Sequence, residues 1–336
     1  MNVLIIGGTK FIGPFVVKQL LEKGHNIALF NRGLTSPSIP ENVTWIKGDR
    51  ETIENHINEF KDFSPDVVLD MIPVNEGHAK KTVEVFHDIA KRIVAISSAD
   101  VYQAYGKLIK IETGEPVPTP CFEDSKLREK LFPYREQVTP DHRLYHYDKI
   151  LVEHIYMTNN KIPGTVLRLP MVYGPGDLQH RLFEYLKRMN DGRPAILLDE
   201  NLAKWKTGRG YVENVAHAIT LAITSPNAAN KIYNVAENNF EEKEWVQSIS
   251  ECMNWNGTIL VVPSGVLPLD FNPLQHLNLS SSKIREELGY QEIVSFQEGL
   301  GRTIEWENSH YPEQIQEGQF NYEHEDEIIE KYETVS

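Results

Sequence analysis

Short, almost entirely apolar strands alternate with amphipathic helices along the first two-thirds of this chain, and this pattern constrains the fold most. The run Val3-Leu4-Ile5-Ile6 has no polar face, which predicts a strand buried on both sides, as in a parallel sheet. We expect strands at residues 2–6, 26–30, 43–46, 66–71, 92–97 and 165–169. We expect helices, from apolar residues at helical spacing, at 11–23, 52–60, 77–90 and 145–159. The alternation predicts an α/β fold with a right-handed, doubly wound parallel sheet.

The first predicted strand runs directly into a turn rich in glycine and then into a helix. The turn reads Gly7-Gly8-Thr9-Lys10-Phe11-Ile12-Gly13. Glycines allow a tight turn and close approach of the backbone to a ligand, while the free amides and the dipole of the following helix attract an anion. This order predicts a site for the pyrophosphate of a dinucleotide; a purely structural turn is the alternative.

The second predicted strand is followed by Asn31 and Arg32. At this place a site for NAD usually has an acidic residue, which accepts a hydrogen bond from the ribose 2′-hydroxyl. The planar guanidinium of an arginine instead suits a 2′-phosphate. Together with Lys10, Arg32 therefore favours NADP over NAD, and a solvated surface charge is the alternative for Arg32.

Tyr145 is the only one of fourteen tyrosines with a lysine four residues later, Lys149. On a helix these two side chains share one face, where the ammonium favours the phenolate form of the tyrosine. Hydride transfer at a carbonyl or alcohol needs such a proton donor or acceptor. The pair follows a predicted strand that runs into Ser97-Ser98.

These motifs resemble those of the short-chain dehydrogenase/reductases, in particular their extended, epimerase-like branch, the NAD(P)-dependent epimerase/dehydratase family. Gly7, Lys10 and Gly13 have the spacing of the family's three glycines, with Lys10 in place of the middle one. Residues 168–176, 209–216 and 282–290 resemble further family segments, so the match covers roughly residues 1–308. The resemblance implies a Rossmann-like doubly wound parallel sheet with a smaller C-terminal substrate domain.

The resemblance also implies roles for individual residues. Ser98 would hydrogen-bond the reacting oxygen, Tyr145 would be the acid/base, and Lys149 would hold the nicotinamide ribose and lower the pKa of the tyrosine. Cofactor contacts are implied for Gly7, Thr9, Lys10, Phe11, Ile12, Gly13, Asn31, Arg32, Asp49, Met71, Lys149 and Pro170, with Asp49 on the adenine amino group. Substrate contacts are implied for Asp100, Tyr102, Arg181 and Arg209, and Arg209 matches an arginine that binds the diphosphate of a nucleotide sugar.

Two departures from the family pattern bear on the substrate. Met171 stands where the family often has an asparagine that contacts a nucleotide sugar. Ala99 and Asp100 stand where sugar-nucleotide dehydratases have an Asp-Glu pair. Because dehydration needs an acid and a base besides the tyrosine, the loss of one carboxylate argues against a dehydratase.

The formal charge of the chain is −14 at neutral pH. Residues 313–336 contain eight acidic side chains and one lysine, so they carry −7 and the preceding 312 residues carry the other −7. An acidic chain argues against nucleic-acid or anionic-membrane binding, since phosphates are neutralised by a surplus of Lys and Arg. We expect residues 311–336 to be a solvated acidic tail, with partner docking as the alternative.

Other features concern the compartment and metals. The sequence has no run of about 18 apolar residues, so we expect no membrane-spanning helix. The start, MNVLIIGGTK, has no basic leader and begins directly with a predicted strand. Two distant cysteines, Cys121 and Cys252, are neither a disulfide framework nor a metal site. We therefore expect a cytoplasmic protein without a bound metal.

The length of 336 residues suits two domains of roughly 150 residues each. We expect an NAD(P)-binding domain over residues 1–173, with return segments at about 209–236, and a mainly substrate-binding domain over 174–310. The stretch 106–140 is irregular and contains five prolines. Such a long irregular stretch inside a compact domain is typical of a lid or substrate loop.

The expected function is that of an NAD(P)-dependent epimerase or reductase. It would transfer a hydride at a carbinol or carbonyl carbon of a sugar-like, nucleotide-linked and therefore anionic small molecule. A substrate without a nucleotide stays open because of Met171. A non-catalytic NAD(P)-binding or RNA-associated protein is the alternative, because the opening glycine turn also resembles that of chloroplast stem-loop-binding relatives. The family commonly dimerises through the Tyr-x-x-x-Lys helix, so the resemblance implies a homodimer.

Overall fold

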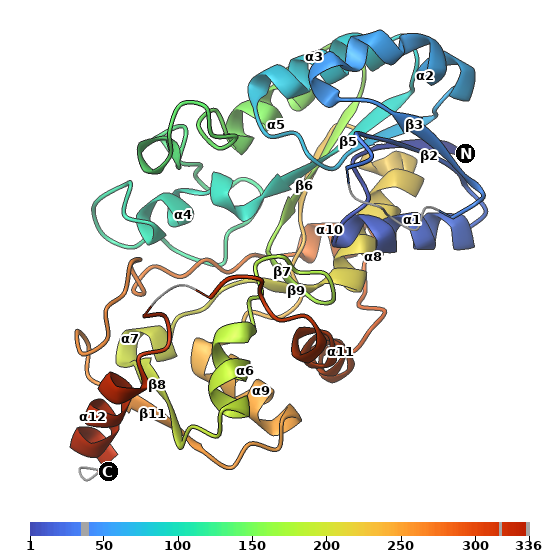
Figure 1. Ribbon diagram of the computed structural model, residues 1–336. Helices are drawn as coiled ribbons and strands as arrows, with labels where there is room; N and C mark the ends of the chain where they lie inside the picture. The colour runs from blue at the N-terminus through green and yellow to red at the C-terminus, as the bar shows by residue number, and fades with distance from the viewer. Residues whose placement is uncertain (35–39, 316–317, 334–336) are drawn as a thin grey trace.

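A seven-stranded parallel sheet is the largest feature of the computed structural model, which describes residues 1–34, 40–315 and 318–333 (Figure 1). The strand order is β10-β6-β5-β4-β1-β2-β3. The strands are β1 Asn2–Ile6, β2 Asn26–Asn31, β3 Val43–Lys47, β4 Val67–Asp70, β5 Arg92–Ser98, β6 Gly164–Leu169 and β10 Lys231–Asn234. β1 pairs with both β2 and β4, so the strand order reverses there. The predicted α/β fold with a doubly wound parallel sheet is confirmed.

Alternate residues of β1 point to opposite faces of the sheet, and each face has its own apolar core. Val3 and Ile5 belong to the core under α1 and α8, whereas Leu4 and Ile6 belong to the core under α2, α3 and α5. Figure 1 shows these two helical layers on either side of the sheet. The helices are α1 Ile12–Glu22, α2 Ile57–Phe63, α3 Glu76–Phe86, α4 Gln103–Leu108, α5 Lys149–Thr158 and α8 Val212–Thr224. The four apolar residues of β1 are thus buried on both sides, as predicted.

Two predicted helices differ from the observed ones in a way that affects the site. The helix predicted over 145–159 begins only at Lys149, because the Asp148 side chain accepts a hydrogen bond from the backbone N–H of Ile150 at 2.8 Å and caps the helix there. The helix predicted over 52–60 is a 3-10 stretch, η1 Arg50–His56, followed by α2. The other 3-10 helices are η2 Ala99–Val101, η3 Arg135–Gln137 and η4 Pro226–Ala228.

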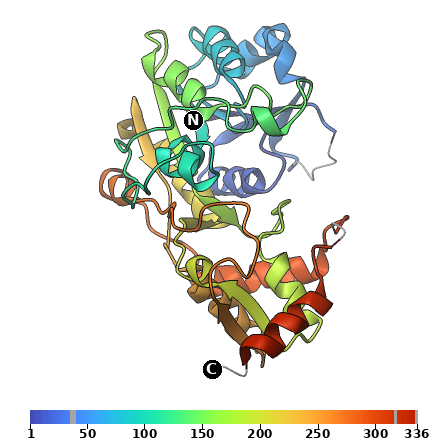
Figure 2. The same ribbon diagram turned by 90° about the vertical axis from the view of Figure 1, so that its left-hand side faces the viewer.

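Most elements after β6, apart from α8, β10 and α10, form a smaller group below the large sheet (Figure 2). β8 Ala195–Asp199 pairs in parallel with β11 Thr258–Val262, and β7 Met171–Tyr173 pairs in parallel with β9 Arg209–Tyr211. The helices of this group are α6 Phe183–Asn190, α7 Glu200–Ala203, α9 Glu242–Cys252, α11 Phe296–Ser309 and α12 Tyr322–Glu333, whereas α10 Ser282–Leu288 contacts α8 and the strand β10 of the large sheet. The division into domains at residue 173 stays a prediction. Over the described ranges, no helix is both long enough and apolar enough to cross a membrane.

The acidic C-terminal segment, predicted as a solvated tail, contains a helix that packs onto the smaller group. α12 lies against β8 and β11. The side chains that hold it are two buried isoleucines and three ion pairs: Ile328 and Ile329, Arg188–Glu325, Arg193–Glu325 and Arg193–Asp326. The prediction of a solvated tail is wrong for this helix, because apolar burial and two arginines on the surface below stabilise the docked position.

The proline-rich stretch 106–140 forms backbone hydrogen bonds with two separate parts of the protein. The backbone N–H of Arg128 donates to the carbonyl of Val101 at 2.8 Å, next to the end of β5. On the other side, the backbone N–H of Cys121 donates to Asn278 at 2.8 Å, and that of Ser280 donates to Cys121 at 2.9 Å. The stretch therefore lies between the large sheet and the smaller group, and its role as a lid or substrate loop stays a prediction.

Candidate active site

The turn between β1 and α1 is closed tightly around its glycines. Gly7 and Gly8 have φ angles of 95° and 78°, a region that favours glycine. A Cβ on Gly13 would lie 2.4 Å from the backbone carbon and oxygen of Gly8, so no larger residue fits there. α1 has no side-chain N-cap; the Gly13 N–H donates to the Lys10 carbonyl at 3.0 Å, and among the described residues no side chain competes with an anion for the other amides of the first turn. The predicted cofactor residues of this turn are Gly7, Thr9, Lys10, Phe11, Ile12 and Gly13.

The end of β2 has no acidic side chain. Asn31 Oδ1 accepts hydrogen bonds from the backbone N–H of Gly33 at 3.0 Å and from Trp45 Nε1 at 3.3 Å. The side chains of Lys10 and Arg32 are exposed, and neither forms a hydrogen bond or ion pair with a residue that the structure describes. We call the glycine turn, residues 7–13, the cradle. Lys10 and Arg32 thus place two cations at this cradle, and neither has a carboxylate partner in the described part of the chain.

Asp49, predicted to contact adenine, caps the 3-10 helix after β3. Its Oδ1 accepts a hydrogen bond from the backbone N–H of Glu51 at 3.0 Å. The side chain is half-buried, and an adenine contact would use its other oxygen.

A buried ion pair supports the connection after β4, which contacts the glycine turn. Asp70 accepts two hydrogen bonds from the Arg50 guanidinium, at 2.9 and 3.0 Å, and one from the Tyr156 hydroxyl at 2.7 Å. Burial alone would raise the pKa of Asp70, but the Arg50 guanidinium outweighs it and lowers that pKa. A Cβ on Gly7 would lie 3.5 Å from Met71 Cβ, so this connection lines the cradle. Arg50 and Asp70 were not predicted as site residues; the only signal was an acid at the end of an apolar strand.

Ser98 and Lys149 lie at the carboxyl end of β5. Ser98 is the last residue of the strand, and its Oγ accepts a hydrogen bond from the backbone N–H of Asp100 at 3.2 Å. Lys149 is the first residue of α5, and its Nζ donates to the carbonyls of Pro73 and Ile96 at 2.8 and 2.9 Å. Burial lowers the pKa of Lys149 to about 8. The ammonium therefore links the ends of β4 and β5.

Tyr145 does not share a helical face with Lys149, because it lies in the turn before α5. Its ring lies 5.0 Å from the Arg135 guanidinium and contacts His146 edge-on. Its backbone carbonyl accepts a hydrogen bond from Arg135 Nε at 3.2 Å. Within the described part of the chain, the Tyr145 hydroxyl forms no hydrogen bond. The helical geometry expected for this pair is thus wrong, and the capping by Asp148 is the reason.

Tyr147 lies beside Lys149 instead. Lys149 Nζ is 5.7 Å from the centre of the Tyr147 ring, and the Tyr147 hydroxyl donates to Asp100 Oδ2 at 2.5 Å. Burial and the Asp100 carboxylate raise the pKa of Tyr147 well above its ordinary value. Burial also raises the pKa of Asp100, whose other oxygen has no hydrogen-bond partner among the described residues. The sequence could not single out Tyr147, because in a turn the residue spacing does not fix which side chain faces the lysine.

Tyr102, predicted to contact substrate, is fully buried at 0% exposure. Its hydroxyl donates to Asn234 Oδ1 at 2.6 Å and accepts a hydrogen bond from Arg168 Nη1 at 2.9 Å. Arg168 in turn pairs with Glu153 at 2.7 Å. Both hydrogen bonds of the hydroxyl are therefore made inside the protein, between β6 and β10. The prediction of a substrate contact for Tyr102 is wrong.

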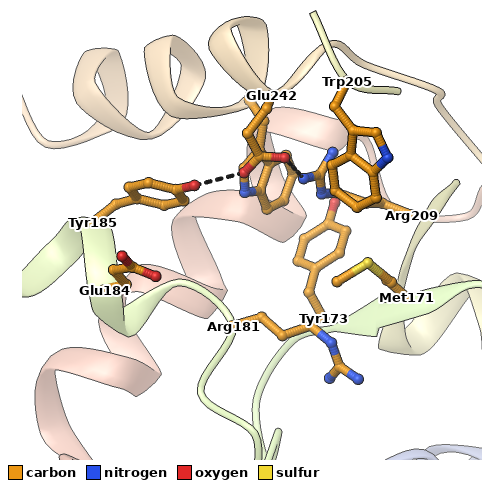
Figure 3. Close-up of a pocket in the computed structure, with 9 residues that line it drawn as sticks. Met171, Tyr173, Arg181, Glu184, Tyr185, Trp205, Arg209 and Glu242 are labelled. Carbon is orange, nitrogen blue, oxygen red and sulfur yellow. Dashed lines mark hydrogen bonds and ion pairs between the residues drawn. The ribbon is translucent and has the colours of Figure 1, made fainter. Parts of the chain in front are cut away.

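A cavity of about 120 Å³ opens beyond β7 (Figure 3). Pro170 leads from β6 into β7, whose Met171 lines the cavity. The lining residues are Met171, Tyr173, Arg181, Glu184, Tyr185, Trp205, Arg209, Glu242 and Trp245. Two predicted substrate residues, Arg181 and Arg209, thus line one cavity. Asp100, also predicted to contact substrate, does not line it and is instead hydrogen-bonded to Tyr147. Over the described ranges, no three potential metal ligands gather at one place.

Comparison with known proteins identifies the family. The model of the NAD dependent epimerase/dehydratase family matches residues 3–236, more than half of the chain. The chain belongs to this family. The Bordetella bronchiseptica enzyme WbmG, solved in complex with NAD and UDP, has the same fold, at a TM-score of 0.67 and 17% identity over 92% of this chain and 95% of that one.

Two curated relatives differ widely in what their names describe. The chloroplast stem-loop binding protein of 41 kDa b of Arabidopsis thaliana is 22% identical over 250 residues, which cover 70% of this chain and 58% of that protein. The 2′-dehydrokanamycin reductase of Streptomyces kanamyceticus is 24% identical over 212 residues, which cover 61% of this chain and 53% of that protein. The chain thus spans little more than half the length of these relatives.

Proposed function

We propose that this protein transfers a hydride between a nicotinamide cofactor and a carbinol or carbonyl carbon of a sugar-like substrate, as an NAD(P)-dependent epimerase or reductase. The position of Lys149 carries this proposal. Its ammonium donates to Pro73 and Ile96 at the ends of two central strands, and the connection after β4 also supports the glycine turn. A cofactor whose pyrophosphate lies on that turn would have its nicotinamide half at the carboxyl edge of the sheet.

Ser98 and Lys149 have complementary tasks in this proposal. With a pKa of about 8, Lys149 is mostly protonated at neutral pH, and the one N–H that Pro73 and Ile96 leave free would donate to a hydroxyl of the nicotinamide ribose. The Ser98 hydroxyl accepts a hydrogen bond from Asp100 N–H and keeps its own proton to donate to the reacting oxygen of the substrate. The bound cofactor supplies or accepts the hydride.

The phenol that exchanges the proton is assigned to Tyr145 by motif spacing and to Tyr147 by geometry. The hydrogen bond from Tyr147 to Asp100 keeps the Tyr147 phenol protonated. To donate this proton to the alkoxide that forms when a carbonyl accepts a hydride, the Tyr147 O–H would turn from Asp100 to the substrate oxygen. Geometry therefore favours Tyr147 as the donor in the direction of reduction.

Separate Tyr145→Phe and Tyr147→Phe variants test this assignment. We expect Tyr147→Phe to lower kcat about 10²–10⁴-fold and to leave NADPH affinity unchanged, with Tyr134→Phe as a control on the neighbouring ring. NADPH oxidation against a panel of keto sugars gives kcat, and NADPH fluorescence gives the affinity. A large loss in Tyr145→Phe with a normal Tyr147→Phe would return the role to Tyr145. Full activity in both variants would contradict the proposed mechanism.

The fate of the hydride separates an epimerase from a reductase. An epimerase returns the same hydride to the other face of the substrate, so the cofactor is regenerated. A reductase consumes NADPH in proportion to product. Deuterium placed on the nicotinamide ring therefore accumulates in the product of a reductase.

Exposed cations at the cradle support NADP as the cofactor. Lys10 and Arg32 have no carboxylate partner in the described part of the chain, and no acid at the end of β2 is available for the 2′-hydroxyl of NAD. The 2′-phosphate of NADP would supply the charge that these two side chains lack.

Non-catalytic RNA association is the second candidate, because of the similarity to the stem-loop binding protein. The chain's net charge of −14 works against phosphate binding. Salt-sensitive retention on RNA, without turnover of any keto sugar, would favour this candidate over the enzyme.

We also propose that the protein is a homodimer that uses α5. Ile150, Leu151 and Ile155 are only half-buried in the single chain, and burial against a second copy would remove them from water. Light scattering decides the point, since the mass of one chain is 38.5 kDa.

A further inference from the structure

The cavity of Figure 3 adjoins the proposed catalytic end of the sheet. Met171 lines the cavity and packs onto the apolar cluster that contains Ala99 and Trp205. Ala99 directly follows Ser98, and Ser98 is paired with Leu169 in the sheet. A substrate whose reacting oxygen lies on Ser98 would therefore extend toward this cavity.

Arg209, which the family resemblance assigns to a diphosphate, already has a carboxylate partner. Its guanidinium pairs with Glu242, and both side chains are only 7% exposed. The other oxygen of Glu242 accepts a hydrogen bond from the Tyr185 hydroxyl at 2.7 Å. The guanidinium also lies over the Trp245 ring, 4.4 Å from its centre. Its charge is thus neutralised from within the protein.

The second arginine of the cavity is paired in the same way. Arg181 Nη1 donates to Asp177 at 2.6 Å and to the carbonyl of Val172 at 2.7 Å. Glu184 adds a further carboxylate to the wall. Glu184 itself lies 3.5 Å from Arg188, so each guanidinium of the cavity is paired with a carboxylate and the wall has no unpaired positive charge. A diphosphate placed here would meet like charge, which costs several kcal/mol at an interface.

The cavity nevertheless offers hydrogen bonds to a ligand. Three buried polar atoms that line it have no partner among the described residues: Tyr173 Oη, Arg181 Nε and Arg209 Nη1. Figure 3 shows the Tyr173 hydroxyl directed toward Arg209, with Trp205 beside it. Buried donors without acceptors are costly, and hydroxyl or ether oxygens of a ligand would satisfy them without adding charge.

We propose that this cavity binds one uncharged sugar ring and that the substrate is a glycoside without a diphosphate. The volume of about 120 Å³ is below the roughly 300–1,000 Å³ of sites for larger ligands, which favours a single ring over a nucleotide. The aromatic side chains pack against the ring's C–H faces, and the three donors bind its oxygens. This inference rests on the proposed hydride transfer, because it names the substrate class of that reaction.

Calorimetric titration with UDP and with methyl β-D-glucopyranoside tests the inference, using the full chain saturated with NADPH. We expect the glucoside, but not UDP, to bind the wild-type protein. Glu242→Gln leaves Arg209 without its partner, so UDP affinity should rise about tenfold or more. Glu251→Gln, an exposed change on the same helix, should leave both titrations unchanged. Glu184→Gln, at the more exposed wall, should raise UDP affinity less than Glu242→Gln and serves if Glu242→Gln does not fold.

The outcomes separate this inference from the proposed function. Tight UDP binding by the wild type, weakened rather than strengthened in Glu242→Gln and Glu184→Gln, would overturn the uncharged substrate. Turnover of UDP-glucose, with no turnover of glucosides, would do the same and leave hydride transfer intact. NADPH binding without turnover of any sugar would contradict hydride transfer, while the UDP titrations would still decide the charge of the cavity.

Discussion

Arg32 at the end of β2 and Arg209 in the cavity carry the same charge in opposite surroundings. Arg32 is exposed and has no ion pair within the described residues, whereas Arg209 is buried against Glu242. The first guanidinium can take a ligand's negative charge, and the second already has a negative partner. The residue type at a family position therefore indicates a ligand only when the charges around it are known.

We expect Gly13→Ala to reduce cofactor affinity more than any other change. A Cβ there would lie 2.4 Å from the backbone of Gly8, so the turn must open and the cradle is lost. We expect NADPH affinity to fall at least about 100-fold, or roughly 3 kcal/mol, as measured by fluorescence titration.

Gly301→Ala is the matched control, because a Cβ at this helical position meets nothing within 4 Å. It should keep NADPH affinity and gain up to about 1 kcal/mol of stability. Normal NADPH binding by Gly13→Ala would show that the cofactor does not use this turn.

The two arginines themselves give the next largest effect. Arg209→Met leaves the buried Glu242 carboxylate unpaired, and we expect the free energy of unfolding to fall by about 3–5 kcal/mol. Arg32→Met removes the same charge from an exposed site, and we expect a change within about 0.5 kcal/mol. Urea unfolding of both variants measures the difference.

For NADPH affinity we expect the opposite order, with the larger effect in the Arg32 variant. Arg32→Met should weaken NADPH about tenfold, which is 1.4 kcal/mol, and leave NADH affinity unchanged. A large loss of stability in Arg32→Met, or equal effects on NADPH and NADH affinity, would contradict the difference drawn between the exposed Arg32 and the buried Arg209.

Lys149 predicts a pH dependence of stability. Its pKa is about 8 in the folded protein and about 10.4 when unfolded. Between these values the unfolded chain binds more protons, so the free energy of unfolding rises with pH, by about 3 kcal/mol in all. Below about pH 8 the cost of the buried charge is fully present. Urea unfolding of the wild type should show this rise across the pH range, and Lys149→Met should lack it, because methionine does not titrate. The same pH dependence in both proteins would show that Lys149 is solvated.

Local features made the large sheet and the cradle predictable from sequence. The apolar run of β1 and the glycines after it act within a few residues, so no distant contact was needed to interpret them. Asp148 was also a local signal, since an acid before an apolar helical run is typical of an N-cap, and it explains why α5 begins at Lys149 and not at Tyr145.

The substrate end depends on contacts between residues far apart in the chain. Glu242 lies 33 residues after Arg209, and Asn234 lies 132 residues after Tyr102. No periodicity connects such partners, so the family-like positions of Arg209 and Tyr102 suggested ligand contacts where the protein pairs them internally. Arg50 and Asp70 were missed for the same reason.

The docked position of α12 has a consequence for synthesis of the chain. The large sheet is complete once β10, which ends at Asn234, has left the ribosome. β8 and β11 are both present at Val262, but the helix that covers them ends at Glu333. Because domains fold as they emerge from the N-terminus onward, the large sheet closes well before the smaller group is covered. The helix that covers β8 and β11 is therefore synthesised more than 50 residues after the strands that it covers.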